Sequence, residues 1–299
     1  MDNFILIALA IVLGYILQKL NIFSKEAPTT LNQFVIYISL PAMILLQIPK
    51  LSFSIDMFMP IIIAWSVMII SVILVLSVSK LLEFSKEITG CLMLVTVLGN
   101  SSFLGIPIVN AYFGAEALPY VIVYDQLGTF IALASYGTFV ASYYSSKSEL
   151  NFKIIIQKVL TFPPFLSLVL ALFLMGVNFP SLINNVLETL SSTIVPLALV
   201  AVGLQLKLKL PGHEVKPFTA ALLIKLLIAP TIAILMCKLF SWSSEAASVS
   251  IMEAGMAPMI TAGAVASMAG LAPRLSSAIV GYGILISFLT TAVLYKIII

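Results

Sequence analysis

Long apolar runs separated by short polar breaks constrain the fold of this 299-residue chain more than any other feature. A helix that crosses a lipid bilayer needs about 20 consecutive, mostly apolar residues. Ten runs of this kind are present, called spans 1 to 10 below: 3–20, 29–48, 57–80, 88–113, 118–144, 154–177, 181–206, 217–240, 244–269 and 274–298. Because the runs are continuously apolar rather than alternating, they predict membrane-spanning helices and not a β-barrel.

The composition excludes several other classes of protein. Apolar residues make up 61% of the chain and charged residues 9%, whereas an ordinary soluble protein has about 25% charged residues. So few charges cannot cover a soluble surface, and so high a hydrophobic content excludes a disordered chain. The single histidine excludes a His-rich metal site, and a net charge of +3 does not suggest a nucleic-acid partner. The sequence therefore predicts an all-α integral membrane protein.

Basic residues gather in the breaks that follow the odd-numbered spans. Loops on the cytoplasmic side of a membrane are enriched in Lys and Arg. We therefore expect the odd loops to lie in the cytoplasm, both termini to lie outside it, and the protein to reside in the cell membrane. Eleven of the 15 basic residues have this placement: Lys19, Lys25, Lys80, Lys86, Lys147, Lys153, Lys158, Lys207, Lys209, Lys216 and Arg274.

The most polar break, at 145–158, divides the chain into two halves of five spans, residues 1–148 and 149–299. Because five is odd, the second half enters the membrane upside down relative to the first. The halves also match weakly, since Pro41 in span 2 corresponds to Pro196 in span 7, and spans 4 and 9 both carry Gly and Pro near their middles. Inverted repeats with interrupted helices at matching positions are typical of secondary transporters.

Span 4 carries the polar string Gly99-Asn100-Ser101-Ser102 and, further on, Gly105 and Pro107. Proline lacks an amide donor and clashes with the preceding turn, so we expect the helix to break here near the bilayer midplane. Asn100, Ser101 and Ser102 can then offer amide, hydroxyl and carbonyl ligands to an ion or a carboxylate. The alternative is a packing kink in which the serines bond to their own backbone.

Three of the charged residues inside the other spans are candidates for function. Glu253 in span 9 precedes Pro258, at a depth similar to that of the break in span 4, and an intramembrane carboxylate is a functional candidate by default. It can bind Na⁺ or carry a proton, or it can be a neutral structural residue. Asp125 in span 5 is either a second ion ligand or an interface residue. Lys225 in span 8 can pair with these carboxylates, attract an anionic substrate, or snorkel toward the cytoplasm.

These considerations give a predicted site with no catalytic residues, no metal centre and no cofactor other than a coupling ion. Glu253, Asp125 and Lys225 are the candidates for ion or proton coupling, with a possible Na⁺ at Glu253, Asn100 and Asp125. Ser39 in span 2 either lines the substrate path or holds helices together. The predicted substrate-binding residues are Asn100, Ser101, Ser102, Pro107, Ser39, Pro258 and Met259.

The chain resembles the auxin efflux carrier family, the bacterial relatives of the plant PIN proteins. The resemblance is carried by the span 4 string 99–107 with Tyr112-Phe113-Gly114, by Tyr124-Asp125 with Gly128, by Lys225-Leu226 with Pro230, and by Glu253-Ala254-Gly255-Met256 with Pro258. Two departures are visible. Ser101-Ser102 stands where the family has Thr-Gly, and Ala257 separates Met256 from Pro258.

The resemblance implies a fold like that of the bile acid sodium symporters. Spans 1, 2, 6 and 7 would form a scaffold, and spans 3–5 and 8–10 a transport domain in which spans 4 and 9 cross at their prolines. It also implies a homodimer that moves small organic anions, such as malonate or auxin-like carboxylates, by an elevator motion.

We therefore predict a cation-coupled secondary transporter of a small organic anion, and not an enzyme. A receptor that binds a ligand without moving it, and a channel, are the alternatives. The sequence contains no ATP-binding Gly-Lys-Ser/Thr motif, no Arg-rich voltage sensor and no TVGYG-type filter.

Overall fold

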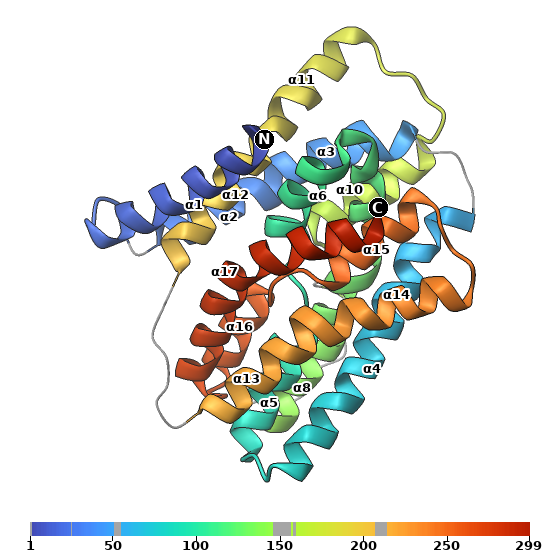
Figure 1. Cartoon of the computed structure of the whole chain (residues 1–299). Helices are drawn as coiled ribbons and strands as arrows, with labels where there is room; N and C mark the ends of the chain where they lie inside the picture. Colours follow the sequence, from blue (N-terminus) through green and yellow to red (C-terminus); the bar gives the residue numbers. More distant parts are fainter. Residues whose placement is uncertain (1, 25, 51–54, 146–156, 158–159, 207–213) are drawn as a thin grey trace.

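The computed structural model describes residues 2–24, 26–50, 55–145, 157, 160–206 and 214–299. Within these ranges the chain is helical, apart from turns and one isolated β-bridge. Figure 1 shows two sets of helices, one across the top of the view and one below it. The all-helical prediction is therefore confirmed for the described residues. The predicted boundary between residues 148 and 149 lies outside the described residues. So do six of the basic residues that follow odd-numbered spans: Lys25, Lys147, Lys153, Lys158, Lys207 and Lys209.

The first set of helices corresponds to spans 1, 2, 6 and 7. Within it, α1 packs along α12, α2 contacts α12, and α3 contacts both α10 and α11 (Figure 1). Its elements are α1 (Asp2–Lys19), α2 (Ala27–Phe34), η1 (Val35–Ser39), α3 (Leu40–Gln47), η2 (Ile48–Lys50), α10 (Pro163–Phe173), α11 (Ser181–Ser192) and α12 (Ile194–Gln205).

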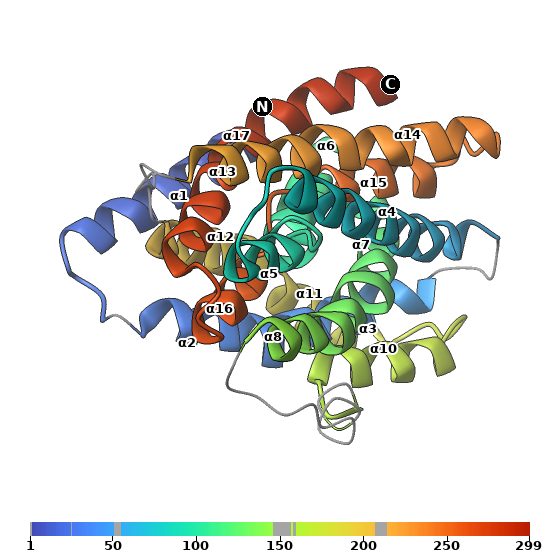
Figure 2. The ribbon, with the colours of Figure 1, turned by 90° about the horizontal axis from the view of Figure 1, so that it is seen from below.

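The second set corresponds to spans 3–5 and 8–10. In it, α4 contacts α14 and α15, while α5, α16 and α17 all contact one another (Figure 2). Its elements are η3 (Ile55–Met57), α4 (Met59–Leu81), α5 (Lys86–Val95), η4 (Ser101–Gly105), α6 (Ile106–Phe113), η5 (Ala115–Ala117), α7 (Leu118–Val123), η6 (Tyr124–Phe130), η7 (Leu133–Gly137), α8 (Thr138–Tyr144), α13 (Val215–Leu223), η8 (Ile224–Ile228), α14 (Ala229–Leu239), α15 (Glu245–Ala254), α16 (Ile260–Met268) and α17 (Pro273–Ile298).

Six continuous helical stretches in the described part of the chain are long and apolar enough to cross a membrane. They are Ala27–Lys50, Met59–Leu81, Ala115–Tyr144, Ser181–Gln205, Val215–Leu239 and Pro273–Ile298. Spans 4 and 9 are missing from this set because each is interrupted near its middle, and spans 1 and 6 contain shorter apolar helices at 9–19 and 163–173. The count of ten spans and the inverted repeat stay predictions.

Large apolar side chains cover much of the outer surface. Leu81, Phe173 and Leu239 are each more than three-quarters exposed, and other Leu, Ile and Phe residues of α1, α4 and α14 are also exposed. An exposed apolar surface of this extent is unfavourable in water and favourable in lipid hydrocarbon. The chain is therefore a multi-pass membrane protein.

A pair of glycines brings α1 and α12 into direct backbone contact. A Cβ added to Gly14 would collide with the carbonyl oxygen of Val200 and lie 3.0 Å from the Cα of Gly203. A Cβ added to Gly203 would collide with the carbonyl oxygen of Ile11 and lie 2.9 Å from the Cα of Gly14. Small residues allow such close approach between helices in membranes, so these two glycines determine how α1 and α12 pack.

Candidate functional site

Spans 4 and 9 are both unwound in the middle, and their unwound segments pair with each other. Residues 96–100 separate α5 from η4, and residues 255–259 separate α15 from α16. Gly99 and Pro258 form an antiparallel bridge, in which Asn100 N donates to Ala257 O at 2.8 Å and Met259 N donates to Leu98 O at 3.0 Å. Main-chain groups that each broken helix leaves free are thus satisfied by the other, as a buried break in a membrane requires. We call this region the crossover.

The break in span 9 coincides with Pro258, as predicted, but the break in span 4 does not coincide with Pro107. Pro107 lies inside the continuous helical stretch Ser101–Phe113, directly after the π-helical turn η4, so the helix is not broken at this proline. The chain is instead unwound at 96–100, where the small Gly99 pairs with Pro258. The predicted crossing at two prolines is therefore wrong for span 4: a glycine meets a proline.

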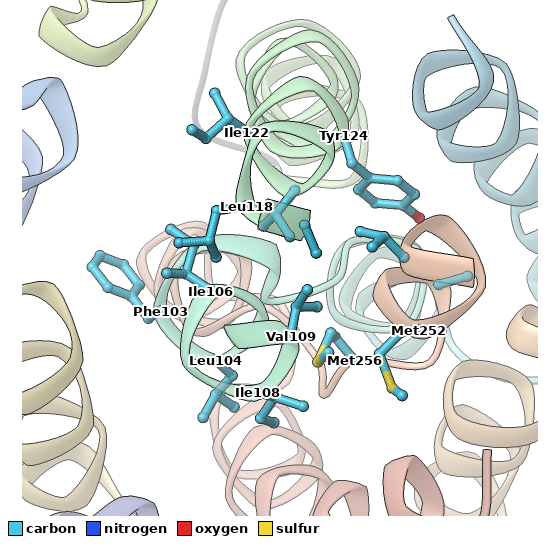
Figure 3. Close-up of a cluster of buried hydrophobic side chains, with 14 of the residues drawn as sticks. Phe103, Leu104, Ile106, Ile108, Val109, Leu118, Ile122, Tyr124, Met252 and Met256 are labelled. Atoms are coloured by element: carbon cyan, nitrogen blue, oxygen red, sulfur yellow. The ribbon is translucent and has the colours of Figure 1, made fainter. Parts of the chain in front are cut away.

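Apolar side chains pack around the second half of span 4. Figure 3 shows Phe103, Ile106, Val109 and their neighbours beside Leu118 and Ile122 of α7 and Met252 and Met256 of span 9. These contacts hold η4 and α6 beside α7 and α15. The polar groups described next are thus surrounded by an apolar core.

Asp125 is the centre of a buried polar network. Ser101 Oγ donates a hydrogen bond of 2.5 Å to Asp125 Oδ1, and Gln126 Nε2 donates one of 2.6 Å to Asp125 Oδ2. The Ser102 side chain also lies close to this carboxyl group. The structure therefore brings two of the predicted substrate ligands, Ser101 and Ser102, onto Asp125 across the contact between spans 4 and 5.

The π-helical segment η6 places Asp125 and exposes a main-chain acceptor. π-turns leave the regular hydrogen-bond ladder incomplete and are frequent at functional sites. Here Trp65 Nε1 on α4 donates to Leu127 O at 3.0 Å. Sequence reasoning missed both Trp65 and Gln126. Gln126 had a usable signal, since it is an amide beside Asp125 within an apolar run.

Glu253 is completely buried, in the last turn of α15. Neither of its carboxylate oxygens has a hydrogen-bond partner. The carboxylate lies against the backbone of Gly105: a Cβ added there would be 2.6 Å from Glu253 Oε2 and would collide with Oε1. Asp125 and Lys225 lie within electrostatic range of it. A buried carboxylate without partners is costly, which makes Glu253 a candidate for binding an ion, a proton or a ligand.

Lys225 is 3% exposed and turns toward the crossover instead of snorkelling to the membrane surface. Its Nζ donates to Ala254 O at 3.1 Å. It also lies over Gly99, where an added Cβ would be 2.8 Å from Nζ. Asp125 and Lys225 thus both lie within electrostatic range of Glu253, although the chain separates the three residues by up to 128 positions (253 − 125 = 128).

Asn100 has its main chain engaged and its side chain free. Its N–H donates to Ala257 O, and its carbonyl accepts from Gly105 N at 3.0 Å. The side-chain Nδ2 is buried with no partner. Ser39, by contrast, makes its contact within the first set of helices, where it bonds to Thr193 Oγ1 at 2.7 Å. Because Thr193 itself donates to Leu190 O, Ser39 is the donor in this pair.

A cavity of about 750 Å³ lies between the two sets of helices. Its lining includes Gln205 of α12 and Ile260, Ser267 and Ser276 of α16 and α17. Ile260 directly follows Met259 of the crossover, whereas the exposed Ser24 and Met268 line the other end. The volume is in the range of small-molecule sites, and the cavity extends from the start of α16 toward the surface.

These features, paired broken helices with buried charged groups and an adjoining cavity, belong to the class of membrane transporters. The model of the membrane transport protein family, the auxin efflux carriers, matches residues 1–295. The chain therefore belongs to this family, and the resemblance expected from the sequence is confirmed.

Two curated relatives are similar over most of their length. One, from Methanocaldococcus jannaschii, is 29% identical over 265 residues, which cover 86% of this chain and 85% of the relative. The other, from Methanothermobacter thermautotrophicus, is 27% identical over 254 residues, covering 82% and 81%. Both carry the name of uncharacterized transporter.

Proposed function

We propose that this protein is a secondary carrier that moves a small organic anion across the cell membrane, with the crossover as its substrate site. The observation that carries the proposal is the pairing of two broken helices beside a cavity of about 750 Å³. Broken helices at corresponding depths are the places where secondary transporters hold substrate and coupling ion. A carboxylate of the malonate or auxin-like type fits the cavity by size.

The helix that begins at the crossover, α16, favours the binding of an anion at its N-terminal end. The N-terminal end of a helix carries a partial positive charge and free N–H groups. The helix α16 begins at Ile260 without a side-chain cap, and Ile260 lines the cavity. The side-chain amide of Asn100, which has no hydrogen-bond partner, also lies at the crossover. In this proposal the substrate is bound by this amide and by the free N–H groups at the start of α16.

Alternating access follows from the arrangement of the two sets of helices. The first set serves as scaffold, and the second carries the crossover past it in an elevator motion. The cavity ends near Ser24 and Met268, which flank spans 1 and 9 on the side of the predicted cytoplasmic loops. In this proposal the structure is the inward-facing state, the carrier works as a homodimer, and Glu253 with Asp125 supplies the coupling to a cation.

The test is substrate exchange in proteoliposomes. A thermal-shift screen of mono- and dicarboxylates first finds a stabilising ligand, since ligand binding raises the unfolding temperature by mass action. Counterflow of that ligand is then measured for the wild type, Asn100→Ala and Asn110→Ala. Asn110 is the matched control, because it lies on the same span but away from the crossover, in α6.

We expect Asn100→Ala to reduce exchange at least about tenfold while leaving folding intact, because its Nδ2 has no partner to lose. Asn110→Ala should exchange like the wild type. Substrate exchange at the wild-type rate by Asn100→Ala would refute the assignment of Asn100 to the substrate site. Binding without counterflow would establish a receptor, and currents above carrier turnover would establish a channel.

A further inference from the structure

We propose that the ammonium group of Lys225 is a built-in cation at the crossover, in the place where a mobile Na⁺ would otherwise bind, so that the protein works without Na⁺. This inference rests on the proposed carrier function and specifies its coupling site. It starts from the direction of the broken helices. Both α5, ending at Val95, and α15, ending at Ala254, point their C-terminal ends at the crossover.

C-terminal helix ends carry partial negative charge and free carbonyl groups. In secondary transporters with broken helices, such ends and unwound carbonyls are the places that coordinate Na⁺ or protons. Here Lys225 Nζ donates to Ala254 O, the last carbonyl of α15, at 3.1 Å. The other broken span contributes Gly99, over which the same Nζ lies. One lysine thus supplies positive charge to both interrupted spans.

The surroundings are shaped for this ammonium group. Glycine at position 99 leaves the space that Nζ occupies, because an added Cβ would be 2.8 Å from Nζ and 3.4 Å from Cε. Lys225 also lies in the π-helical segment η8, which precedes Pro230 in span 8. A lysine inside a membrane is costly, so its burial between the C-terminal end of α15 and the unwound segment at Gly99, within electrostatic range of Glu253, requires the attraction that these groups provide.

A second observation indicates that a free cation would fit if the lysine were shortened. A small cavity of about 20 Å³, room for one water molecule, adjoins Lys225. Oxygen-bearing Tyr124 and Thr129 line it, together with Leu98 and Gly99 of the unwound segment. Truncation of Lys225 to alanine would join this cavity to the vacated space beside Ala254 O. The enlarged space has apolar walls and offers oxygen ligands, which hard cations prefer, from Tyr124, Thr129 and Ala254.

The experiment measures thermal unfolding of the purified full-length protein in equal concentrations of NaCl, KCl, methylammonium chloride and choline chloride. The variants are Lys225→Ala, which opens the space, Lys225→Met, which fills it without charge, and Lys225→Arg, which keeps the charge. We expect NaCl or methylammonium chloride to raise the melting temperature of Lys225→Ala by about 2–4 °C over choline chloride. The wild type, Lys225→Met and Lys225→Arg should shift by less than about 1 °C.

Specific stabilisation of the wild type by Na⁺ overturns the proposal, and so does an equal response of Lys225→Ala and Lys225→Met. If Lys225→Ala cannot be purified, the wild-type comparison decides alone: a Na⁺-specific shift overturns the proposal, and its absence supports it. The readout needs neither substrate nor transport. Failure of the carrier function, seen as no counterflow by the wild type, is therefore distinguishable from failure of this inference.

Discussion

The α1–α12 contact and the crossover both depend on glycine, for opposite reasons. At Gly14 and Gly203 the missing side chains let one backbone touch another. At Gly99 and Gly105 they make room for the charged ends of Lys225 and Glu253. In the first region a new methyl group meets atoms that cannot move, and in the second it meets the far end of a flexible side chain. The same substitution should therefore damage folding in one region and function in the other.

The largest effect is expected for Gly203→Val. Its Cβ would collide with Ile11 O and with the backbone of Gly14, so α1 and α12 must separate. We expect a destabilisation of about 3 kcal/mol or more, measured as loss of folded, monodisperse protein and a lower melting temperature. Gly137→Ala is the control, because an added Cβ there meets Leu133 Cδ1 at 3.1 Å, a side chain able to shift. Wild-type stability of Gly203→Val would show that this contact is not rigid.

Gly105→Ala should have the opposite profile. Its Cβ would displace the Glu253 carboxylate, which has no hydrogen bond to lose. We expect stability to change by less than about 1 kcal/mol and substrate exchange per folded protein to fall at least about tenfold. Counterflow in proteoliposomes measures the substrate exchange, and thermal unfolding measures the stability. A variant that loses stability but exchanges normally when folded would make the crossover resemble the α1–α12 contact.

The smallest effect is expected for Ser39→Ala, which sharpens the comparison within the first set of helices. The change removes the hydrogen bond to Thr193 and should lower stability by about 1 kcal/mol. Because Ser39 is fully buried in that contact, we expect the KM for transport to stay at the wild-type value. A raised KM with unchanged stability would instead place Ser39 on the substrate path.

Much of the fold could be predicted because membrane-spanning helices are recognisable from the local amino-acid composition. Continuous apolar runs gave the helices, and Gly255 with Pro258 gave the break in span 9. For span 4 the local signals are Gly99, Gly105 and Pro107 together, and the crossing with span 9 is expected at the proline. The actual position of the crossing depends on Gly99 pairing with a segment 159 positions later (258 − 99 = 159), which no local pattern encodes.

The site was predictable to the extent that charges are conspicuous in an apolar chain. Glu253, Asp125 and Lys225 stand out by that criterion, and in the structure Asp125 and Lys225 lie within electrostatic range of Glu253. Trp65 does not, since its hydrogen bond goes to a carbonyl that the π-helical turn at Leu127 leaves available. Gln126 and the orientation of Ser101 depend on the same turn, and π-turns have no reliable sequence signature.

The bridge between the two broken spans is made entirely of main-chain atoms. Any residue at positions 98 and 257, and any residue except proline at position 100, presents the same carbonyl or amide, so these side chains can vary while the two spans stay joined. In the proposed carrier, side chains that contact the substrate can therefore change while the main-chain bridge between spans 4 and 9 is kept. One architecture can in this way serve different solutes.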